Sequence, residues 1–383
     1  MNMMTEITRQ HLIDPEICIR CNTCEENCPK NAIVHDTRNY VVKAEICDNC
    51  MTCVQNCPTG AVDAWRFIGG QEPYTIEDQF TWNKLPEDTQ PTQSPAHHAA
   101  PASAPKPVVN LFTARAPATA TVTTNVRITA ADASSDIHHI VIDLGSHHYP
   151  VLEGQSVGIL PPGTDTEGSP HQMRVYSIAS PRDGEGGRGT AIALTVKRVT
   201  QDHEGRPVRG ICSNYLCDLP PGHQVQVVGP FGANFLMPDD PAASIVMMCT
   251  GTGIAPMRAM IERRKTVAGT GKMSLYYGGR TPGELPYLAE LQALPASAVD
   301  LNIAFSRVAN QPKTYIQDLM RRRSADIAAR LQDETSYFYM CGLKGMERGI
   351  LDAFRDICTE HGLDWDPLHA RMQHDARLHV ETY

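Results

Sequence analysis

Segments rich in Val, Ile and Thr alternate with turn residues in the middle of the chain. They include ATVTTNVRITAAD, HHIVIDLG and TAIALTVKRVT. Short β-branched runs that are separated by turn residues are typical of strands in an antiparallel sheet or barrel. The pattern therefore predicts an antiparallel β-barrel domain over residues 109–237.

The hydrophobic pattern changes after residue 237. The segment SIVMMCTGTGIAPMRAMIERR contains an apolar strand, a Gly-rich turn and a helix, and ETSYFYMCGLKGMERGILDAFRDICTEHG repeats that order. Strands that alternate with helices indicate a mostly parallel sheet, which binds ligands at the carboxyl ends of its strands. We therefore predict an α/β domain over residues 238–383.

Two segments near the N-terminus repeat each other. ICIRCNTCEENCPKNAI begins at Ile17, and ICDNCMTCVQNCPTGAV begins at Ile46. Each repeat is too small to bury a core alone, so we expect one pseudo-twofold domain over residues 1–70. The following residues, 71–108, are polar and then rich in Pro, Ala and Ser without periodicity, which predicts a linker.

Composition and charge narrow the class of protein. The chain has 383 residues, 42% of them hydrophobic, and a net charge of -9. The negative charge argues against nucleic acid or an anionic membrane surface as the main partner. We find neither a secretory signal nor an apolar run of membrane-spanning length. The thirteen cysteines are therefore expected to be thiolates in a reducing cytoplasm.

Eight of these cysteines follow the spacing C-x2-C-x2-C-x3-C-P twice. In this pattern three thiolates of one run bind one 4Fe-4S cluster, and the fourth, next to proline, reaches the cluster of the other run. We predict two clusters, the first held by Cys18, Cys21, Cys24 and Cys57 and the second by Cys47, Cys50, Cys53 and Cys28. Paired zinc sites are the alternative, but zinc usually joins two separated C-x2-C knuckles. The pattern resembles the bacterial two-cluster ferredoxins, which implies an α+β fold.

Two short motifs in the barrel suit a flavin. In the first, Arg174 can pair with a diphosphate, the ring of Tyr176 can stack on an isoalloxazine, and the hydroxyl of Ser177 can bond its N5. The second motif, G-x-C-S, begins at Gly210. An ordinary strand with a surface arginine is the alternative reading of the first motif.

The order of the motifs R-x-Y-S, G-x-C-S-N-Y-L, G-P-F-G and a Gly-rich nucleotide loop resembles the plant-type ferredoxin-NADP+ reductases, from about residue 125 to the last residue. The resemblance implies that the chain binds FAD. It assigns the pyrophosphate and the flavin ring to Arg174, Tyr176 and Ser177. It assigns the pyrophosphate also to the turn that contains Gly210, Cys212 and Ser213.

A Gly-rich turn and two basic pairs suit NADPH. The small residues of the turn let backbone amides and a helix N-terminus approach phosphate. A 2′-phosphate needs cations and hydroxyls nearby, and both pairs match the NADP-selective members of the family. The turn is Thr250, Gly251, Thr252 and Gly253, and the pairs are Ser306 with Arg307 and Lys313 with Tyr315. The run Arg321-Arg322-Arg323 is interpreted as a solvated helix face, with docking of an acidic partner as the alternative.

The resemblance also implies roles near the C-terminus. It places Cys341 beside the nicotinamide and Glu347 at the adenosine. It makes Glu381 the active-site carboxylate and places Tyr383 over the flavin as a gate. Together with Ser177, the residues Cys341, Glu381 and Tyr383 are the predicted catalytic residues.

The fusion of a two-cluster ferredoxin with a plant-type reductase that ends in VETY resembles the reductase components of benzoyl-CoA 2,3-epoxidases. In that family electrons reach a separate di-iron oxygenase component. The resemblance implies an NADPH-dependent oxidoreductase of aromatic catabolism that passes electrons from FAD to two 4Fe-4S clusters and then to the oxygenase. The alternatives are a general fused ferredoxin-NADP+ reductase and a non-catalytic iron-sulfur relay.

Overall fold

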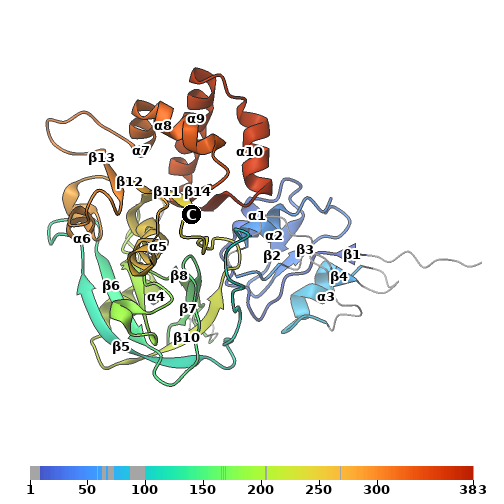
Figure 1. The fold of residues 1–383 in the computed structure, drawn as a ribbon. Helices are drawn as coiled ribbons and strands as arrows, with labels where there is room; N and C mark the ends of the chain where they lie inside the picture. The colour runs from blue at the N-terminus through green and yellow to red at the C-terminus, as the bar shows by residue number, and fades with distance from the viewer. Residues whose placement is uncertain are drawn as a thin grey trace, which may run out of the picture. The chain divides into compact units, whose positions relative to one another are not determined.

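The computed structural model describes residues 9–57, 59–62, 66–67, 73–86, 100–164, 166, 168, 170–202, 205–267 and 269–382. The chain divides into two compact units (Figure 1). The first unit is Met1–His98 with Thr113–Ala116, and the second is Ala99–Phe112 with Pro117–Tyr383.

The first unit is built from the two cysteine repeats. Each repeat contributes a short helix and apolar residues to one shared core, which includes Ile13, Ile33, Val42 and Val62. A core shared in this way fits repeats that are each too small to fold alone. The helices and strands are α1 (Thr23–Glu26), α2 (Thr52–Asn56), β1 (Arg9–Gln10) paired with β4 (Arg66–Phe67), and β2 (Ile33–His35) paired with β3 (Tyr40–Val42).

A further helix, α3 (Ile76–Thr81), belongs to the first unit and lies within the range that was predicted as linker. Thr75 and Asp78 form a capping box at its N-terminus, which satisfies backbone N–H groups that the helix cannot pair itself. The buried side chain of Gln79 donates to the carbonyl oxygen of Val42 at 2.9 Å and accepts from its N–H group at 3.0 Å. These bonds attach α3 to the edge of strand β3.

The barrel of the second unit is antiparallel, with strand order β8-β7-β10-β5-β6-β9. Beyond the two edge strands, Ile178 pairs with Leu194, and the N–H group of Ala179 donates to the carbonyl oxygen of Ala193 at 2.7 Å. These contacts join the edges and close the barrel. Helix α4 (Ile211–Asp218) contributes Cys212 and Leu216 to the barrel core. The strands are β5 (Ala118–Arg127), β6 (Ile137–Asp143), β7 (Ser156–Leu160), β8 (Arg174–Ser177), β9 (Ala191–Lys197) and β10 (Gln224–Phe231).

The rest of the second unit is a parallel sheet of strand order β13-β12-β11-β14-β15. Its central strands are apolar at nearly every position because both faces of the sheet are covered. In β11, for example, Ile245 to Cys249 are all buried. The strands are β11 (Ser244–Thr250), β12 (Met273–Gly279), β13 (Asp300–Phe305), β14 (Ser336–Gly342) and β15 (Leu378–Thr382).

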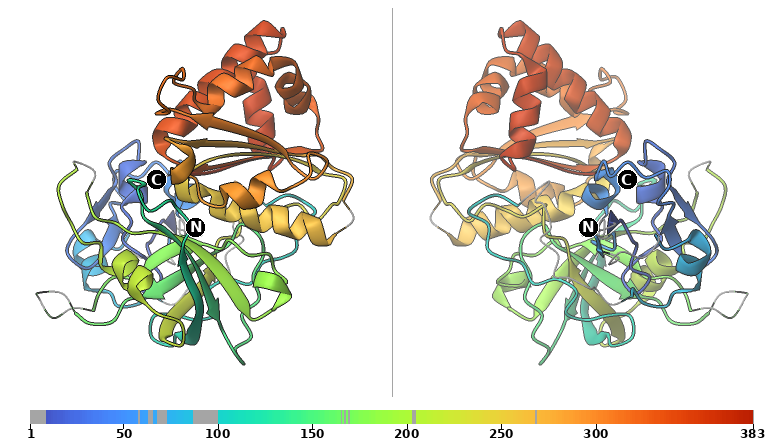
Figure 2. Two further views of the ribbon diagram at one scale, coloured as in Figure 1. Left: turned by 90° about the vertical axis from the view of Figure 1, so that its left-hand side faces the viewer. Right: turned by 90° about the vertical axis from the view of Figure 1, so that its right-hand side faces the viewer.

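Helices cover the two faces of this sheet, as the views in Figure 2 show. Alternate residues of β11 divide between two cores, with Ile245 and Met247 on one face and Val246 and Met248 on the other. Helices α5 (Ile254–Thr266) and α6 (Leu288–Gln292) pack on the first face. The second face carries α7 (Ile316–Arg322), α8 (Ser324–Gln332), α9 (Lys344–Glu360) and α10 (Trp365–His374).

The predicted multidomain fold, with a ferredoxin-like domain, an antiparallel barrel and a parallel-sheet domain, is confirmed. Within the described residues, we find no helix with the length and apolar character needed to cross a membrane.

Candidate functional site

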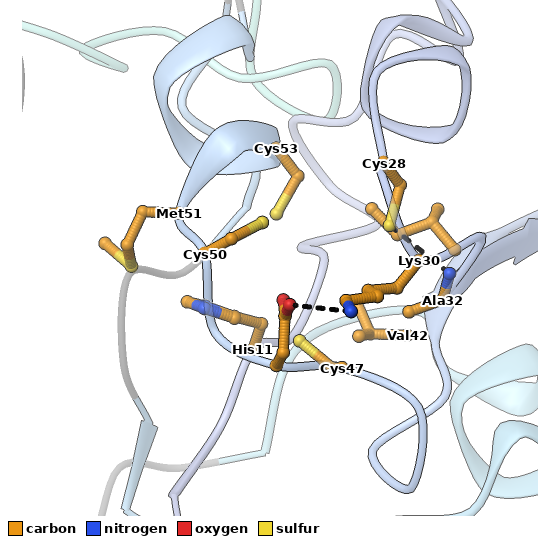
Figure 3. A pocket seen from close by; sticks show the side chains of 11 residues that line it. His11, Cys28, Lys30, Ala32, Val42, Cys47, Cys50, Met51 and Cys53 are labelled. Carbon is orange, nitrogen blue, oxygen red and sulfur yellow. Dashed lines mark hydrogen bonds and ion pairs between the residues drawn. The ribbon is translucent and has the colours of Figure 1, made fainter.

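The eight cysteines of the two repeats line two separate pockets. Each pocket takes three cysteines from one repeat and the fourth from the other, which is the division that the spacing predicted. One pocket is lined by Cys28, Cys47, Cys50 and Cys53, and the other is lined by Cys18, Cys21, Cys24 and Cys57. Figure 3 shows the sulfur atoms of the first set directed toward a common space.

The local backbone explains how closely spaced cysteines face one pocket. Two residues in each cysteine loop have positive φ angles, between 55° and 65°. They are Arg20 and Asn22 in the first repeat and Asn49 and Met51 in the second. These left-handed residues curl each loop between its cysteines. The N–H group of Ala32 donates to Cys28 Sγ at 3.2 Å, and the pseudo-equivalent bond from Ala61 to Cys57 Sγ is 3.1 Å long. Such bonds stabilise thiolates.

The chemistry of these thiols fits a bound iron cluster. Burial raises the pKa of Cys18 to about 11 and that of Cys53 to about 12. Buried thiols of this kind ionise only when a cation replaces the proton. In the part of the chain that the structure describes, no three His, Cys, Asp or Glu side chains gather around one single-ion position. Each set of four cysteines is instead spread over the wall of a pocket.

The residues predicted to hold FAD lie around strand β8. Arg174 and Tyr176 are two residues apart, so their side chains leave β8 on the same face. Cys212, in the first turn of α4, has its thiol hydrogen-bonded to Tyr176 and 3.8 Å from the carbonyl oxygen of Ile159. Ile159 is also the register partner of Arg174. An exposed cation, an aromatic ring and the start of a helix therefore lie close together, which suits a flavin diphosphate.

The serine side chain of the G-x-C-S turn forms hydrogen bonds within the protein. Ser213 Oγ accepts from the N–H group of Val199 at 3.2 Å and donates to the carbonyl oxygen of Gly210 at 3.3 Å. A Cβ atom on Gly210 would lie 2.8 Å from both Ser213 Oγ and Val199 Cβ. The backbone amides of this turn, rather than its side chains, are thus the groups that can bind a pyrophosphate.

The Gly-rich turn packs tightly against the end of β14. A Cβ atom on Gly253 would lie 2.1 Å from the carbonyl oxygen of Cys341, and one on Gly342 would lie 2.5 Å from Thr250 Oγ1. Cys341 is in register with Cys249 of β11 on one side and with Glu381 of β15 on the other. The structure therefore brings the Gly-rich turn, Cys341 and Glu381 together at the edge of the sheet where its parallel strands end.

Two acidic groups at this edge of the sheet have raised pKa values. Burial raises the pKa of Glu381 to about 7. Burial, followed by the charge of Glu381, raises the pKa of Cys341 well above its ordinary value. Glu347, in the first turn of α9, accepts a hydrogen bond from Thr382 Oγ1 at 2.5 Å. Tyr383 lies outside the described residues.

The predicted 2′-phosphate residues lie at the opposite end of the same edge, beyond β13. Ser306 Oγ donates to the carbonyl oxygen of Gly279 at 3.3 Å. Lys313 Nζ lies 5.1 Å from the centre of the Tyr315 ring. Both side chains are exposed, as is that of Arg307. Since β13 and β15 are separated by four strand spacings of about 4.8 Å each, the two ends of this edge are about 19 Å apart, a distance that an extended dinucleotide can span.

A buried polar group between the barrel and the sheet domain was missed by the sequence interpretation. Tyr287, which precedes α6, bonds through its hydroxyl to His139 Nδ1 at 2.9 Å and to Thr195 Oγ1 at 2.8 Å. The guanidinium of Arg258 lies 5.0 Å from the centre of the same ring. These residues come from β6, β9, α5 and the residue before α6. They form no sequence motif, so no local signal could have identified them.

Comparisons with known proteins cover both parts of the chain. Residues 17–61 match the family described as 4Fe-4S dicluster domain, and residues 247–352 match the family described as Oxidoreductase NAD-binding domain. The cyanelle ferredoxin–NADP reductase of Cyanophora paradoxa is 39% identical over 289 residues, which are 72% of this chain and 79% of the relative. The chloroplastic ferredoxin–NADP reductase of Spinacia oleracea is 38% identical over 72% of this chain and 78% of the relative.

Solved structures show the same fold. A ferredoxin-NADP+ reductase from Plasmodium falciparum superposes with a TM-score of 0.56 at 22% identity, over 72% of this chain and 99% of that one. The curated relatives establish more than the fold, because their identity exceeds 30% over most of their length. The chain therefore belongs to the ferredoxin–NADP reductase family, and it carries a 4Fe-4S ferredoxin domain at its N-terminal end.

Proposed function

We propose that this oxidoreductase oxidises NADPH and passes the electrons through FAD and two 4Fe-4S clusters to a separate acceptor protein. The observation that carries the proposal is the division of the eight cysteines between two pockets, in a chain that belongs to the ferredoxin–NADP reductase family. The relatives are named for ferredoxin as a separate reactant. Here a ferredoxin domain is covalently attached, which raises its effective concentration at the flavin.

Named groups of the chain support each part of the proposal. The exposed cation of Arg174, the ring of Tyr176, the hydroxyl of Ser177 and the first-turn amides of α4 would hold FAD. FAD, when bound, exchanges a hydride with nicotinamide and single electrons with iron-sulfur clusters. The turn before α5 would bind the NADPH pyrophosphate. Cys341 and Glu381 would face the nicotinamide, since both end at the sheet edge beside that turn.

We propose that the acceptor is a separate di-iron oxygenase that epoxidises benzoyl-CoA. The domain order and the VETY terminus support this partner. Attachment of a ferredoxin domain speeds electron exchange between the flavin and its clusters, which supports a protein partner that exchanges electrons with those clusters. None of the thirteen cysteines, all of which lie in the described residues, forms a disulfide, which fits a cytoplasmic location. The names of the curated relatives favour a second candidate, a general ferredoxin-NADP+ reductase, which differs in acceptor and in direction of electron flow.

The cofactors are tested first on anaerobically purified protein. We expect about eight iron atoms and eight acid-labile sulfides per chain, one FAD, and bleaching of the flavin by NADPH. Full reduction should take about two equivalents of NADPH, or of dithionite if the clusters are too low in potential. Cys57→Ala is expected to lose about half of the iron, whereas Cys217→Ala, a buried cysteine of the barrel, should lose none. About four iron atoms in the native protein would contradict the two-cluster proposal.

The acceptor is tested separately. The reductase is mixed with candidate di-iron oxygenase components, benzoyl-CoA, oxygen and NADPH. We expect NADPH consumption and epoxide formation in equal amounts, with neither in the Cys57→Ala variant. If NADPH is consumed without product, and a separate ferredoxin is reduced instead, the general reductase is the better description.

A further inference from the structure

The two cysteine loops have the same backbone but different charge. When ICIRCNTC is aligned with ICDNCMTC, Arg20 falls on Asn49. The φ angles of the two residues are 55° and 59°. The backbone N–H group of Arg20 bonds to Cys18 and that of Asn49 to Cys47. One loop therefore presents a cation at the point where the other presents a neutral amide.

The backbone conformation of this position favours asparagine. For most L-residues the left-handed region costs about 1–2 kcal/mol, and Asn is among the few side chains enriched there. The second repeat has that residue. The first repeat has a long cationic side chain there instead, which the loop geometry does not require.

The Arg20 side chain has an incomplete set of partners at its pocket. It lines the space between Cys18, Cys21, Cys24 and Cys57. One terminal nitrogen donates to the carbonyl oxygen of Asp36 at 2.9 Å, which fixes the guanidinium. Its Nε–H group is buried and has no hydrogen-bond partner among the described residues. A buried donor without a partner costs about 1–3 kcal/mol, and the sulfur atoms of a bound cluster would supply the missing acceptor.

No described carboxylate forms an ion pair with Arg20. The hydrogen bond from Arg20 goes to the backbone carbonyl of Asp36, whose carboxylate accepts at Oδ1 from the N–H groups of Arg38 and Asn39, each at 2.6 Å. The charge of Arg20 is therefore partly offset by the nearby Asp36 carboxylate, but without a direct ion pair.

The other pocket has a balanced charge. Lys30 and Asp48 both line it, and Lys30 Nζ lies 3.6 Å from Asp48 Oδ2. Figure 3 shows Lys30 at the wall of this pocket. The ion pair brings one positive and one negative charge to the same wall. His11 lines this pocket at the position that Tyr40 occupies in the other repeat. The two pockets thus differ most in the unpaired cation of Arg20.

We infer that Arg20 raises the reduction potential of the cluster bound by Cys18, Cys21, Cys24 and Cys57 above that of its neighbour. Reduction adds one electron and no proton to a cluster, so it adds one negative charge, which a nearby cation and an N–H donor stabilise. When the two clusters share one electron, the cluster beside Arg20 is then the one that is mainly reduced. The inference depends on the two clusters of the proposed function.

The test is an anaerobic potentiometric titration of the full chain, followed by EPR of the reduced clusters. Arg20→Asn restores the residue of the other repeat, and Asn49→Arg introduces the cation there. We expect Arg20→Asn to shift the electron equilibrium between the clusters by about tenfold, which is about 59 mV for one electron. Asn49→Arg should raise the potential of the other cluster. Arg38→Asn is the matched control, since it removes an exposed charge of the same unit that bonds to Asn83.

The outcomes separate the inference from the proposed function. If the native protein shows one cluster by iron content and EPR, the proposed function and the inference both fail. If two clusters are present and Arg20→Asn moves both potentials equally, or no more than Arg38→Asn does, the inference alone is overturned. Should Arg20→Asn fail to assemble its cluster, Asn49→Arg decides, because an unchanged potential in that variant also overturns the inference.

Discussion

Arg258 and Glu185 form two parallel hydrogen bonds, from Nη1 to Oε2 at 2.8 Å and from Nη2 to Oε1 at 2.9 Å. Arg258 lies on α5 of the sheet domain, and Glu185 lies in the short 3-10 helix Glu185–Gly187 of the barrel domain. Their side chains are only 9% and 19% exposed. This pair joins the domain that contains the proposed flavin site to the one that contains the proposed nicotinamide site.

Arg258→Gln is expected to lower the free energy of unfolding by about 3–5 kcal/mol, because it leaves the Glu185 carboxylate buried without its cation. Urea unfolding of the flavin-loaded protein at pH 7 measures the change. Arg263→Gln is the matched control on the same helix. Its partner Asp183 is 51% exposed, so that variant should lose less than about 1 kcal/mol. Equal losses in the two variants would contradict the structural role of Arg258.

The pair of Arg258 and Glu185 also makes the stability of the folded protein depend on pH, and the direction of that dependence follows from the pKa of Glu185. Burial alone would raise the pKa of Glu185, but the hydrogen bonds and charge of Arg258 outweigh it and lower that pKa. A lowered folded-state pKa contributes stability above the ordinary pKa, and this stability is lost as pH falls through the folded-state value. The stability difference between the native protein and Arg258→Gln should therefore shrink on acidification below about pH 4.

Gly253→Ala should disrupt the nucleotide turn, since its Cβ atom would lie 2.1 Å from the carbonyl oxygen of Cys341. That contact is with backbone, so β11 and β14 must separate. We expect NADPH affinity to fall by at least about tenfold, which is about 1.4 kcal/mol, with a lower thermal midpoint. Gly345→Ala, in α9 with no atom within 4 Å of its Cβ position, should change neither. A Gly253→Ala protein that binds NADPH normally would contradict the tight packing.

Sequence reasoning found the groups whose chemistry requires a fixed local spacing. The spacing of the cysteine runs predicted the same division that the two pocket linings show, because short gaps and an exchanged fourth cysteine are typical of cubane ligands. The role of these cysteines as ligands of two clusters stays a prediction. The contacts of His139 with Tyr287 could not be predicted, because they depend on how two domains pack. Helix α3 was missed for a related reason. A six-residue helix is unstable alone, and Gln79 stabilises it through contacts with a distant strand.

Arg307→Ala should weaken binding of NADPH but not of NADH, if its exposed guanidinium contacts the 2′-phosphate. Loss of one charge-assisted bond costs about 1.5–3 kcal/mol, so KM for NADPH should rise by at least about tenfold. The effect should diminish at high salt, because exposed charges are screened. Arg322→Gln removes an exposed charge from the nearby helix α7 and serves as the control. A parallel rise in KM for NADH would exclude a specific phosphate contact.

Tyr383→Ser is expected to tighten binding of pyridine nucleotides and to weaken discrimination against NADH. The expectation follows from the family resemblance, in which the terminal ring stacks on the flavin and must move aside before nicotinamide can enter. Stacking energy of about 0.5–1.5 kcal/mol would then no longer oppose nicotinamide binding. Steady-state kinetics with both nucleotides measure the change, and Tyr383→Phe should retain native behaviour. An unchanged ratio of kcat/KM for NADH and NADPH in Tyr383→Ser would refute the gate.

Glu381→Gln should make the protein more stable than the native form at pH 8 and leave its stability unchanged at pH 4. Burial raises the pKa of Glu381 to about 7, so the folded state favours the protonated carboxyl. The stability that this group contributes is fully present below the ordinary pKa of a glutamate and is lost as pH rises through about 7. The amide of Gln cannot ionise and avoids the loss, which amounts to at most about 3 kcal/mol.

Urea unfolding at the two pH values, with the same flavin content, measures the effect of Glu381→Gln. Asp352→Asn changes an exposed carboxyl of α9 whose ion pair among the described residues is with Arg355. It is the control and should change stability by less than about 1 kcal/mol at either pH. A gain at pH 8 locates the proton on Glu381 at neutral pH, beside Cys341. Equal stability of Glu381→Gln and the native protein at both pH values would mean that Glu381 titrates as a solvated carboxyl, and it could then not hold a proton at the sheet edge during turnover.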